Sequence, residues 1–381
     1  MSDYARYGHE ARIRRASPGE RMRIGLCAIG WFLLVVAFLL GLPILAALPP
    51  WLLAALGALA LVLALPAFLL LRALRRRRGL DEAGSPGTWV RCSFASVLLV
   101  GAAVGAPVYY LSYRVEAAPL LLPQATLTNG EKTVVFQAMV HVGSEGFYKP
   151  VVYDLEVAVA GGYRLYYEGV QPSTPEADRW FSEMLAGGKD LSANYKELAG
   201  ACGLEFQLDW FEPLVADMKA RPERHVTADV TTAEMKAEFD RLAAADPAFA
   251  ASFRKQPAQP APAEAAADDG PLDLLLDGFR NGTDGQKRIA GLVCRGVFSI
   301  ALDPRNPRPD AQIDRVILDF RNAKLVERIL AEQNPRIFIT YGGAHLKGVL
   351  ALLQQHDPRW TVASVKWIRG IGAPEHFDRP L

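Results

Sequence analysis

A long uncharged run near the amino terminus constrains the fold most. From Ile24 to Leu71, 48 consecutive positions carry no Asp, Glu, Lys or Arg. A membrane-spanning helix needs about 20 apolar residues, so this run is long enough for two spans. Because prolines interrupt the run at Leu48–Pro50, we predict spans near 24–47 and 51–71, joined by a very short turn.

A second uncharged run, Cys92–Tyr113, has 22 residues and ends in Tyr109, Tyr110 and Tyr113, which suit a membrane interface. A signal peptide does not explain the first run, because another apolar run follows it directly and no small-residue cleavage site precedes the second. We therefore predict a three-span membrane region over 24–113, with the third span at 92–113. Two spans with a re-entrant segment are the alternative.

Arginines gather on one side of these spans. Six precede the first span and five follow the second, whereas the turn between the two is uncharged. By the positive-inside rule we expect a cytoplasmic tail over 1–23, a cytoplasmic basic loop over 72–91 and an extracytoplasmic chain after Arg114. The Arg75–Arg78 run could instead bind nucleic acid or anionic lipid, but its place beside a span favours the topological interpretation. The expected location is a bacterial plasma (inner) membrane, with the carboxyl-terminal domain in the periplasm.

The charge balance changes after the membrane region. Residues 1–91 carry 12 Lys and Arg against 5 Asp and Glu, which leaves 30 against 36 for the remainder. A mildly acidic remainder does not favour nucleic-acid binding. Cys27 and Cys92 lie in or beside the spans and are expected to pack as small apolar residues. Cys202 and Cys294 fall in the extracytoplasmic part, where a disulfide is chemically permitted, but the sequence does not decide whether they pair.

The stretch Val134–Val170 has the pattern of a strand, a helix and a second strand. The expected elements are a β-branched strand over Val134–Val140, a helix from Lys149 to Gly161 and a tyrosine-rich strand over Tyr163–Tyr167. This order within about 35 residues predicts a parallel βαβ unit. His141 and Glu168 then lie at the carboxyl ends of the two strands, where open α/β sheets place their chemistry.

A matching arrangement closes the chain. A β-branched strand over Arg336–Tyr341 runs directly into Gly342–His345, a helix follows, and a final strand covers Trp360–Ile368. A stalk over Val115–Gln124 and a hairpin around Asn129-Gly130 are expected before the βαβ unit. One long helix is expected over Gln312–Glu332. The remaining expected helices cover Thr174–Ala186, Tyr195–Cys202, Glu212–Lys219, Thr232–Ala244, Leu272–Phe279 and Gln286–Leu302. A Pro/Ala-rich insert at 256–269 is not a domain boundary, because the sheet is still incomplete there. We predict one α/β domain over 114–381, with a mixed, largely parallel central sheet flanked by helices.

Three potential metal ligands lie at the predicted strand ends: His141, Glu168 and His345. Two imidazoles and one carboxylate leave an open position on a divalent ion, which can polarise a carbonyl and lower the pKa of bound water. The alternative is that both histidines cap backbone groups at strand ends and that Glu168 is a capping or salt-bridge residue. The spacing alone does not decide between these interpretations.

Six strings carry a resemblance to a known family. They are AMVHVGSEGFY, YYEGV and YGGAHLKG at the strand ends, and KELAGACGLEFQLDW, RHVTADVTTAEM and DFRNAKLVERI between them. Together they resemble the TraB/PrgY/GumN family and its relatives the Tiki metalloproteases, which have paired Gly-x-x-His motifs and a glutamate after the strand between them. The resemblance covers roughly Ala125–Ile368 and not the spans. One departure is Ala138, which stands where the first motif typically has glycine and would narrow the pocket.

The resemblance implies an EreA/ChaN-like fold and a site. By similarity, His141, Glu168 and His345 match the metal-binding or catalytic positions, and Arg321 matches a recurrent arginine whose guanidinium can stabilise an oxyanion. The implied cofactor is a divalent metal ion of the Zn, Mn or Co type. Glu168 and Arg321 are therefore the expected catalytic residues, and the general base is unassigned.

These expectations favour a membrane-anchored, metal-dependent hydrolase, a peptidase acting on a secreted or envelope peptide or acyl substrate. The alternatives are a non-catalytic protein that sequesters or inhibits a peptide signal, and a membrane scaffold with a vestigial pocket. The expected partners are a peptide or envelope-protein substrate and membrane lipid. Weaker site candidates, each with an ordinary structural alternative, are Asp229 near His225, Glu145, Asp319, Asn322 and Tyr341. The chain has no Gly-rich phosphate loop, no Gly-x-Ser-x-Gly and no paired Cys-x-x-Cys, which disfavours nucleotide-binding, serine-hydrolase and thioredoxin-type functions.

Overall fold

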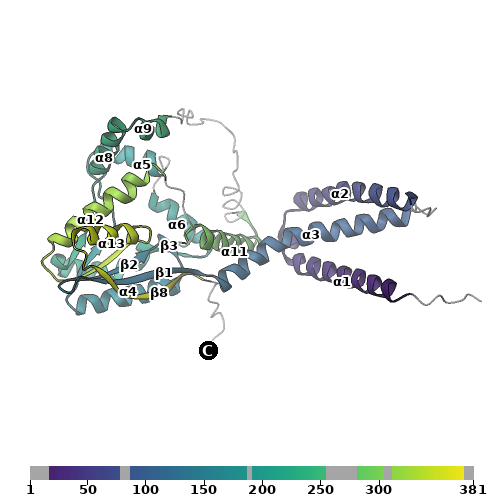
Figure 1. The fold of residues 1–381 in the computed structure, drawn as a ribbon, viewed down its shortest axis with the longest axis horizontal. Coiled ribbons are helices and arrows are strands. Elements are labelled where there is room, and N and C mark those ends of the chain that lie inside the picture. Colours follow the sequence, from purple (N-terminus) through teal and green to yellow (C-terminus); the bar gives the residue numbers. More distant parts are fainter. Residues whose placement is uncertain (1–16, 78–85, 187–190, 255–280, 304–310, 373–381) are drawn as a thin grey trace, which may run out of the picture. The chain divides into compact units, whose positions relative to one another are not determined.

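A computed structural model describes residues 17–77, 86–186, 191–254, 281–303 and 311–372. It divides the chain into two compact units, Met1–Tyr109 and Tyr110–Leu381 (Figure 1). The predicted insert at 256–269 and the helix predicted over 272–279 lie outside the described residues. So do most of the tail at 1–23 and the middle of the basic loop at 72–91.

The first unit is built from α1 (Pro18–Ala47), α2 (Pro50–Arg77) and most of α3 (Pro86–Ala117). All three helices are long and apolar enough to cross a membrane, over Arg21–Ala47, Pro50–Leu74 and Pro86–Ala117. The prediction of three membrane-spanning helices is confirmed at this level of length and composition. The stalk predicted over Val115–Gln124 is wrong, because α3 continues to Ala117 and the first strand already begins at Leu120.

Glycines let α1 and α3 approach closely. A Cβ placed on Gly41 would lie 2.9 Å from the carbonyl oxygen of Gly101, and one on Gly105 would lie 2.9 Å from the Cα of Gly41. The hydroxyl of Tyr109 also donates to the carbonyl of Leu40 at 2.6 Å. Small residues at such crossings are typical of membrane helices, where packing rather than the hydrophobic effect drives association.

The second unit contains a six-stranded sheet in the order β6-β4-β7-β2-β1-β8. The strands are β1 (Leu120–Thr128), β2 (Thr133–Met139), β4 (Arg164–Tyr167), β6 (His225–Thr227), β7 (Arg336–Gly342) and β8 (Thr361–Ile371). Pairing is parallel from β6 through β2 and antiparallel from β2 to β1 and from β1 to β8. The predicted mixed, largely parallel sheet flanked by helices is therefore confirmed. The two strands of the predicted βαβ unit are not neighbours, because β7 lies between β2 and β4.

Helices cover both faces of this sheet (Figure 1). One core lies under α4 (Glu145–Ala160), α6 (Leu191–Cys202), α7 (Gln207–Ala220) and α11 (Asp284–Ala301), and the other under α12 (Arg321–Ala331) and α13 (His345–His356). Side chains alternate between the two cores along each strand, as the pleat requires: Leu165 and Phe338 point to the first, and Tyr166 and Tyr341 to the second. A third core joins α5 (Pro175–Ala186), α8 (Thr232–Ala245) and α9 (Pro247–Arg254), and a two-stranded sheet pairs β3 (Val142–Gly143) with β5 (Glu205–Phe206).

Several helices differ from their predicted form, as the next two cases show. Helix α4 begins at Glu145 rather than Lys149, because the fully buried Phe147 and Tyr148 already bond to the carbonyl of Ser144 in its first turn. The single helix predicted over Gln312–Glu332 is divided into a π-helical segment, η2 (Arg315–Phe320), and α12. A π-helical turn shifts the side chains that follow it around the axis, and such turns are frequent at functional sites.

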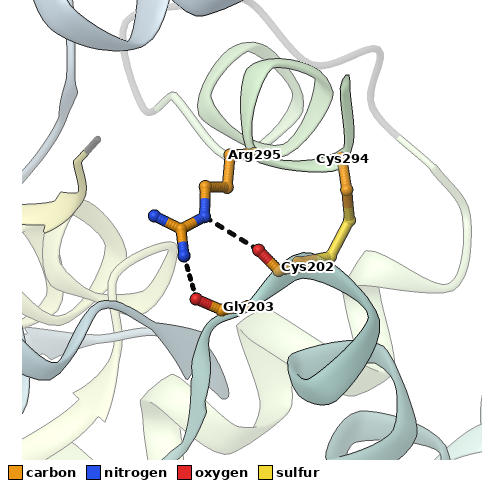
Figure 2. Close-up of a disulfide and its surroundings, with 4 residues drawn as sticks. All are labelled: Cys202, Gly203, Cys294 and Arg295. Atoms are coloured by element: carbon orange, nitrogen blue, oxygen red, sulfur yellow. Dashed lines mark hydrogen bonds between the residues drawn. A yellow bond between two sulfur atoms is a disulfide. The ribbon is translucent and has the colours of Figure 1, made fainter. Parts of the chain in front are cut away.

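A disulfide joins Cys202 at the end of α6 to Cys294 in α11 (Figure 2). Beside it, the buried Arg295 donates from Nε to the carbonyl of Cys202 at 2.8 Å and from Nη2 to the carbonyl of Gly203. Gly203 has φ +59°, the left-handed conformation that ends many helices. The guanidinium therefore binds the carbonyl groups that the end of α6 leaves unpaired.

Candidate functional site

The carboxyl ends of three parallel strands meet at one edge of the sheet. β7 lies between β2 and β4, so the residues that follow these strands are brought together. His141 follows β2, Glu168 follows β4, and Gly342 ends β7, with His345 three residues later. This topology explains how residues about 200 positions apart in the sequence reach one place.

Glu168 is held at both carboxylate oxygens. Its Oε2 accepts the backbone N–H of Gly342 at 2.5 Å, and its Oε1 accepts from Nη2 of Arg321 at 2.7 Å. A Cβ on Gly342 would lie 3.2 Å from Oε2, so a larger residue there would crowd the carboxylate. The backbone N–H of Glu168 is fixed by the carbonyl of Thr340 at 3.0 Å. Charge and geometry thus hold the side chain at the end of β7.

Arg321 links two carboxylates in the buried centre of the site. It is the first residue of α12, directly after the π-helical segment, and it binds Asp229 through Nε at 2.9 Å and through Nη2 at 2.5 Å. Burial opposes the charge on Arg321, but its two acidic partners outweigh burial and raise its pKa, so it stays protonated. Burial also opposes the charge on Asp229, yet the hydrogen bonds from Arg321, Val230 and Gly169 lower the pKa of that carboxyl below its ordinary value.

His345 begins α13, and its two ring nitrogens have different roles. Nδ1 lies 2.8 Å from Oδ1 of Asn322, an acceptor, so Nδ1 carries the proton. Nε2 then carries the lone pair, which accepts a long hydrogen bond from Nη1 of Arg321 at 3.5 Å and lies 3.7 Å from Oε1 of Glu168. Burial lowers the pKa of His345 to about 4, which keeps the ring neutral at pH 7. A neutral imidazole oriented by a partner on its other nitrogen is the form in which histidine binds metals.

His141 lies in the bend between β2 and β3. Its ring stacks on Tyr195 of α6, with centroids 4.5 Å apart, and its carbonyl accepts the N–H of Gln207 at 3.0 Å. The residue is accessible to solvent, yet reduced hydration beside these neighbours lowers its pKa, and the charge of Glu168 partly opposes that shift. The charge of Glu168 thus reaches His141, but no hydrogen bond or ion pair joins these two side chains in the part of the chain that the structure describes.

Ala138 lies in the sheet interior rather than among the polar side chains. It is fully buried with Leu122 and Met139 in the core beneath α4. A Cβ on Gly343 would lie 3.4 Å from the methyl group of Ala138, an ordinary contact distance. Gly343, which has no side chain, therefore leaves room for that methyl group. Ala138 is paired in register with Tyr341 of β7, so the alanine of the first motif lies beside the strand that carries the second motif.

A pocket of about 430 Å³ opens beside Glu168, and we name it the α7 pocket. Its lining consists of Tyr167, Glu168, Gln207, Leu208, Asp209, Phe211, Glu212, Leu214, Val215 and Met218. One wall is the end of β4 and the other is a face of α7. Glu168 therefore belongs both to the polar cluster and to the pocket.

The weaker candidates divide into two groups. Asn322 and Tyr341 lie in the cluster: Asn322 orients His345, and the ring of Tyr341 packs against both Arg321 and His345. Outside the cluster, Glu145 forms a surface ion pair with Lys149, and the ring of His225 is hydrogen-bonded to Tyr167 and Asp217.

Asp229 is more deeply involved than its sequence context indicated. It follows β6, the strand next to β4, so it has the same strand-end position that singled out Glu168. This strand-end position is the sequence feature from which the role of Asp229 could have been predicted. Gln207 had no comparable signal, because α7 was predicted to begin only at Glu212.

The donor set fits a divalent metal in its chemistry. Nε2 of His345 lies 3.7 Å from the carboxylate of Glu168, and the second imidazole, His141, is influenced by the charge of Glu168. Among the described residues, however, no group of three His, Cys, Asp or Glu side chains is arranged to hold an ion. The Arg321 guanidinium bonds to Glu168 and lies within 3.5 Å of His345, so a metal ion here would require that guanidinium to shift.

Comparison of the chain with protein-family models, with curated proteins and with solved structures found no match.

Proposed function

We propose that the chain is a membrane-anchored hydrolase that cleaves a peptide or other acyl bond with the help of a divalent metal ion held by His141, Glu168 and His345. The observation that carries the proposal is the convergence of a neutral, oriented His345, the carboxylate of Glu168 and the cation of Arg321 beside a pocket. The resemblance to the TraB/PrgY/GumN family supports the same assignment and the EreA/ChaN-like fold.

Different residues of the site would have different roles in this reaction. A metal ion bound here would supply Lewis acidity and a more acidic water. Asn322 holds the proton of His345 on Nδ1 and so keeps Nε2 available. Arg321, kept charged by Asp229, supplies the positive charge that would stabilise an oxyanion at the scissile bond. Gly342 fixes the orientation of Glu168 through its N–H.

The proposal places the carboxyl-terminal unit outside the cytoplasm of a bacterium. Arginines that flank the first two spans on one side support this orientation. The disulfide between Cys202 and Cys294 also supports it, because such bonds persist in oxidising compartments and are rare in the cytosol.

A second candidate function has its own support. Arg321 forms ion pairs with both Glu168 and Asp229, so each carboxylate already has a cationic partner without an added metal ion. Such a site suits a non-catalytic protein that sequesters a peptide signal. In that case peptide binding would not depend on metal.

The test uses the purified full-length chain in detergent. We expect elemental analysis to find a stoichiometric transition metal and a fluorogenic peptide library to be cleaved, with cleavage lost on chelation. His345→Gln should lower the bound metal and abolish turnover. The matched control is His356→Gln at the exposed carboxyl end of the same helix, which should change neither.

Two outcomes decide between the candidates. Metal-independent peptide binding without turnover, unchanged in His345→Gln, would remove the hydrolase and favour sequestration. Cleavage that returns on adding back one divalent metal after chelation would remove the pure binding function.

A further inference from the structure

The α7 pocket offers an apolar surface next to the reactive groups. Five of its lining residues are apolar side chains of α7: Leu208, Phe211, Leu214, Val215 and Met218. Leu208 is 55% exposed, and Val215 and Met218 are each 39% exposed, so part of this surface is in contact with water. Removing it from water would favour an apolar ligand, and the pocket falls within the range of about 300–1,000 Å³ typical of ligand sites.

The charges around the pocket are of one sign. Its charged lining residues are Glu168, Asp209 and Glu212. Arg321 compensates Glu168 and Lys196 pairs with Asp209 at 3.1 Å, whereas Glu212 stands exposed at the rim. A ligand carboxylate in this pocket would meet acidic neighbours, so a neutral or cationic ligand is favoured.

Gln207 supplies a directional group on the same wall. It begins α7, where its backbone N–H is held by the carbonyl of His141. Gln207 is 8% exposed, and Oε1 has no hydrogen-bond partner of normal geometry among the described residues, although the side chain lies near enough to the His141 ring to oppose the lowering of its pKa. Buried polar atoms are nearly always hydrogen-bonded, so this oxygen is suited to accept an N–H group from a ligand.

We propose that the α7 pocket binds a bulky apolar side chain of a peptide and that a backbone N–H of the same peptide donates to Gln207 Oε1. Because Glu168 lies in the pocket wall, the bound residue flanks the bond at the polar cluster. The inference rests on the proposed hydrolase and specifies its substrate: a peptide with a large apolar residue, and without an acidic residue, beside the cleaved bond.

Binding is measured directly on the full-length chain in detergent, with a chelator present so that turnover does not contribute. The probes are amidated, acetylated pentaglycines whose central residue is replaced by phenylalanine, leucine, lysine or aspartate. We expect the phenylalanine and leucine peptides to bind about tenfold or more tighter than the aspartate peptide. Equal affinity for the apolar and the acidic peptide overturns the proposal.

Matched variants locate the binding. Val215→Glu puts a carboxylate into the pocket and should weaken the phenylalanine peptide by about tenfold or more. Val157→Glu on α4, at a 52% exposed valine outside the lining, is the control and should leave the affinity unchanged. Equal effects of the two substitutions overturn the assignment, provided that both variants melt like the wild type.

The hydrogen bond is tested with N-methylated peptides. In the wild type, methylation of one backbone N–H should lower affinity by about threefold to tenfold, the value of one hydrogen bond. Gln207→Met keeps the volume but removes the acceptor, so it should bind the plain and methylated peptides equally. A methylation penalty that persists in Gln207→Met removes Gln207 from the proposal.

These measurements separate the two proposals. Tighter binding of the apolar peptides, with no cleavage whichever metal is added, would support the proposed role of the α7 pocket and contradict the hydrolase. Metal-dependent cleavage without any preference for the apolar peptides would support the hydrolase and remove the proposed role of the α7 pocket.

Discussion

At the residue scale, the site depends on a buried ion pair between Arg321 and Asp229. Asp229 is 2% exposed and Arg321 is 9% exposed, and two hydrogen bonds join them. A guanidinium matches a carboxylate in this two-bond geometry, which a lysine cannot reproduce. Removing one partner leaves an uncompensated charge in a poorly hydrated place, and that is the costly case for buried pairs.

Asp229→Asn tests this pair. The amide keeps the shape but not the charge, so we expect the free energy of unfolding to fall by about 3 kcal/mol in urea denaturation at pH 7. Because the folded-state pKa of Asp229 lies below its ordinary 3.8, the stabilisation is complete above that pH and is lost as the pH falls through the lower folded-state value. The difference between wild type and variant should therefore be constant near neutral pH and close only below about 3.8.

The control for this change is Asp240→Asn, which removes one partner of the exposed ion pair with Lys236. It should alter the unfolding curve little, because water already solvates both charges. Equal stability of the wild type and Asp229→Asn at neutral pH would contradict the role of the buried pair.

The sequence predicted the strand-end residues, and the resemblance added Arg321, but the contacts among these residues could not be predicted. His141, Glu168 and His345 were recognisable because strand, turn and helix patterns surround them. Asp229 is only a weaker candidate from the sequence, since its partner Arg321 is 92 positions away and its burial depends on the order of β6 and β4 in the sheet. Local periodicity contains no information on such long-range contacts.

At the element scale, the packing of α12 against α13 sets the orientation of His345. Asn322 in α12 lies against Gly348 in α13, and a Cβ at Gly348 would clash with its amide group. The absence of a side chain at Gly348 thus makes room for the residue that holds the proton of His345 on Nδ1.

We expect Gly348→Ala to destabilise the protein by about 1–3 kcal/mol in thermal unfolding, because the added methyl group overpacks the contact and displaces Asn322. Gly200→Ala in α6 is the matched control: it has no atom within 4 Å of the added Cβ, so it should be neutral or stabilise by up to about 1 kcal/mol. A Gly348→Ala variant as stable as Gly200→Ala would show that Asn322 is not fixed in this way.

Most elements were predictable because their apolar periodicity is strong, and the exceptions have local causes. The β1–β2 hairpin followed from Asn129-Gly130, and Gly130 does take a positive φ of 90°. The π-helical segment η2 was not predictable, because its residues have the same apolar spacing as an α-helix; in the structure, Val316 and Phe320 of this segment pack in the third core. The early start of α4 likewise depends on the burial of Phe147 and Tyr148. The helix therefore includes Pro150, which the sequence pattern placed at a helix start.

At the scale of the whole molecule, the membrane helices and the disulfide bear on one question, the compartment of the α/β unit. The bridge spans 92 positions, and closing a loop of that length contributes about 2–4 kcal/mol to the stability of a folded unit. It also fixes α6, which carries Tyr195 against His141, to α11. A domain on the cytoplasmic side would lose this stabilisation, because the reducing conditions there would keep both thiols free.

Topology and thiol state should therefore agree in cells. Alkaline phosphatase, which is active only outside the cytoplasm, should be active when fused after Arg114 and silent when fused within 78–85. In a Cys27→Ser/Cys92→Ser background, which leaves only Cys202 and Cys294, thiol labelling of denatured protein should find no free thiol before reduction and two after it. Adding Cys202→Ser supplies the control, since it should leave one thiol that labels without reduction. A silent fusion after Arg114 together with two reactive thiols would place the α/β unit in the cytoplasm and invert the proposed orientation.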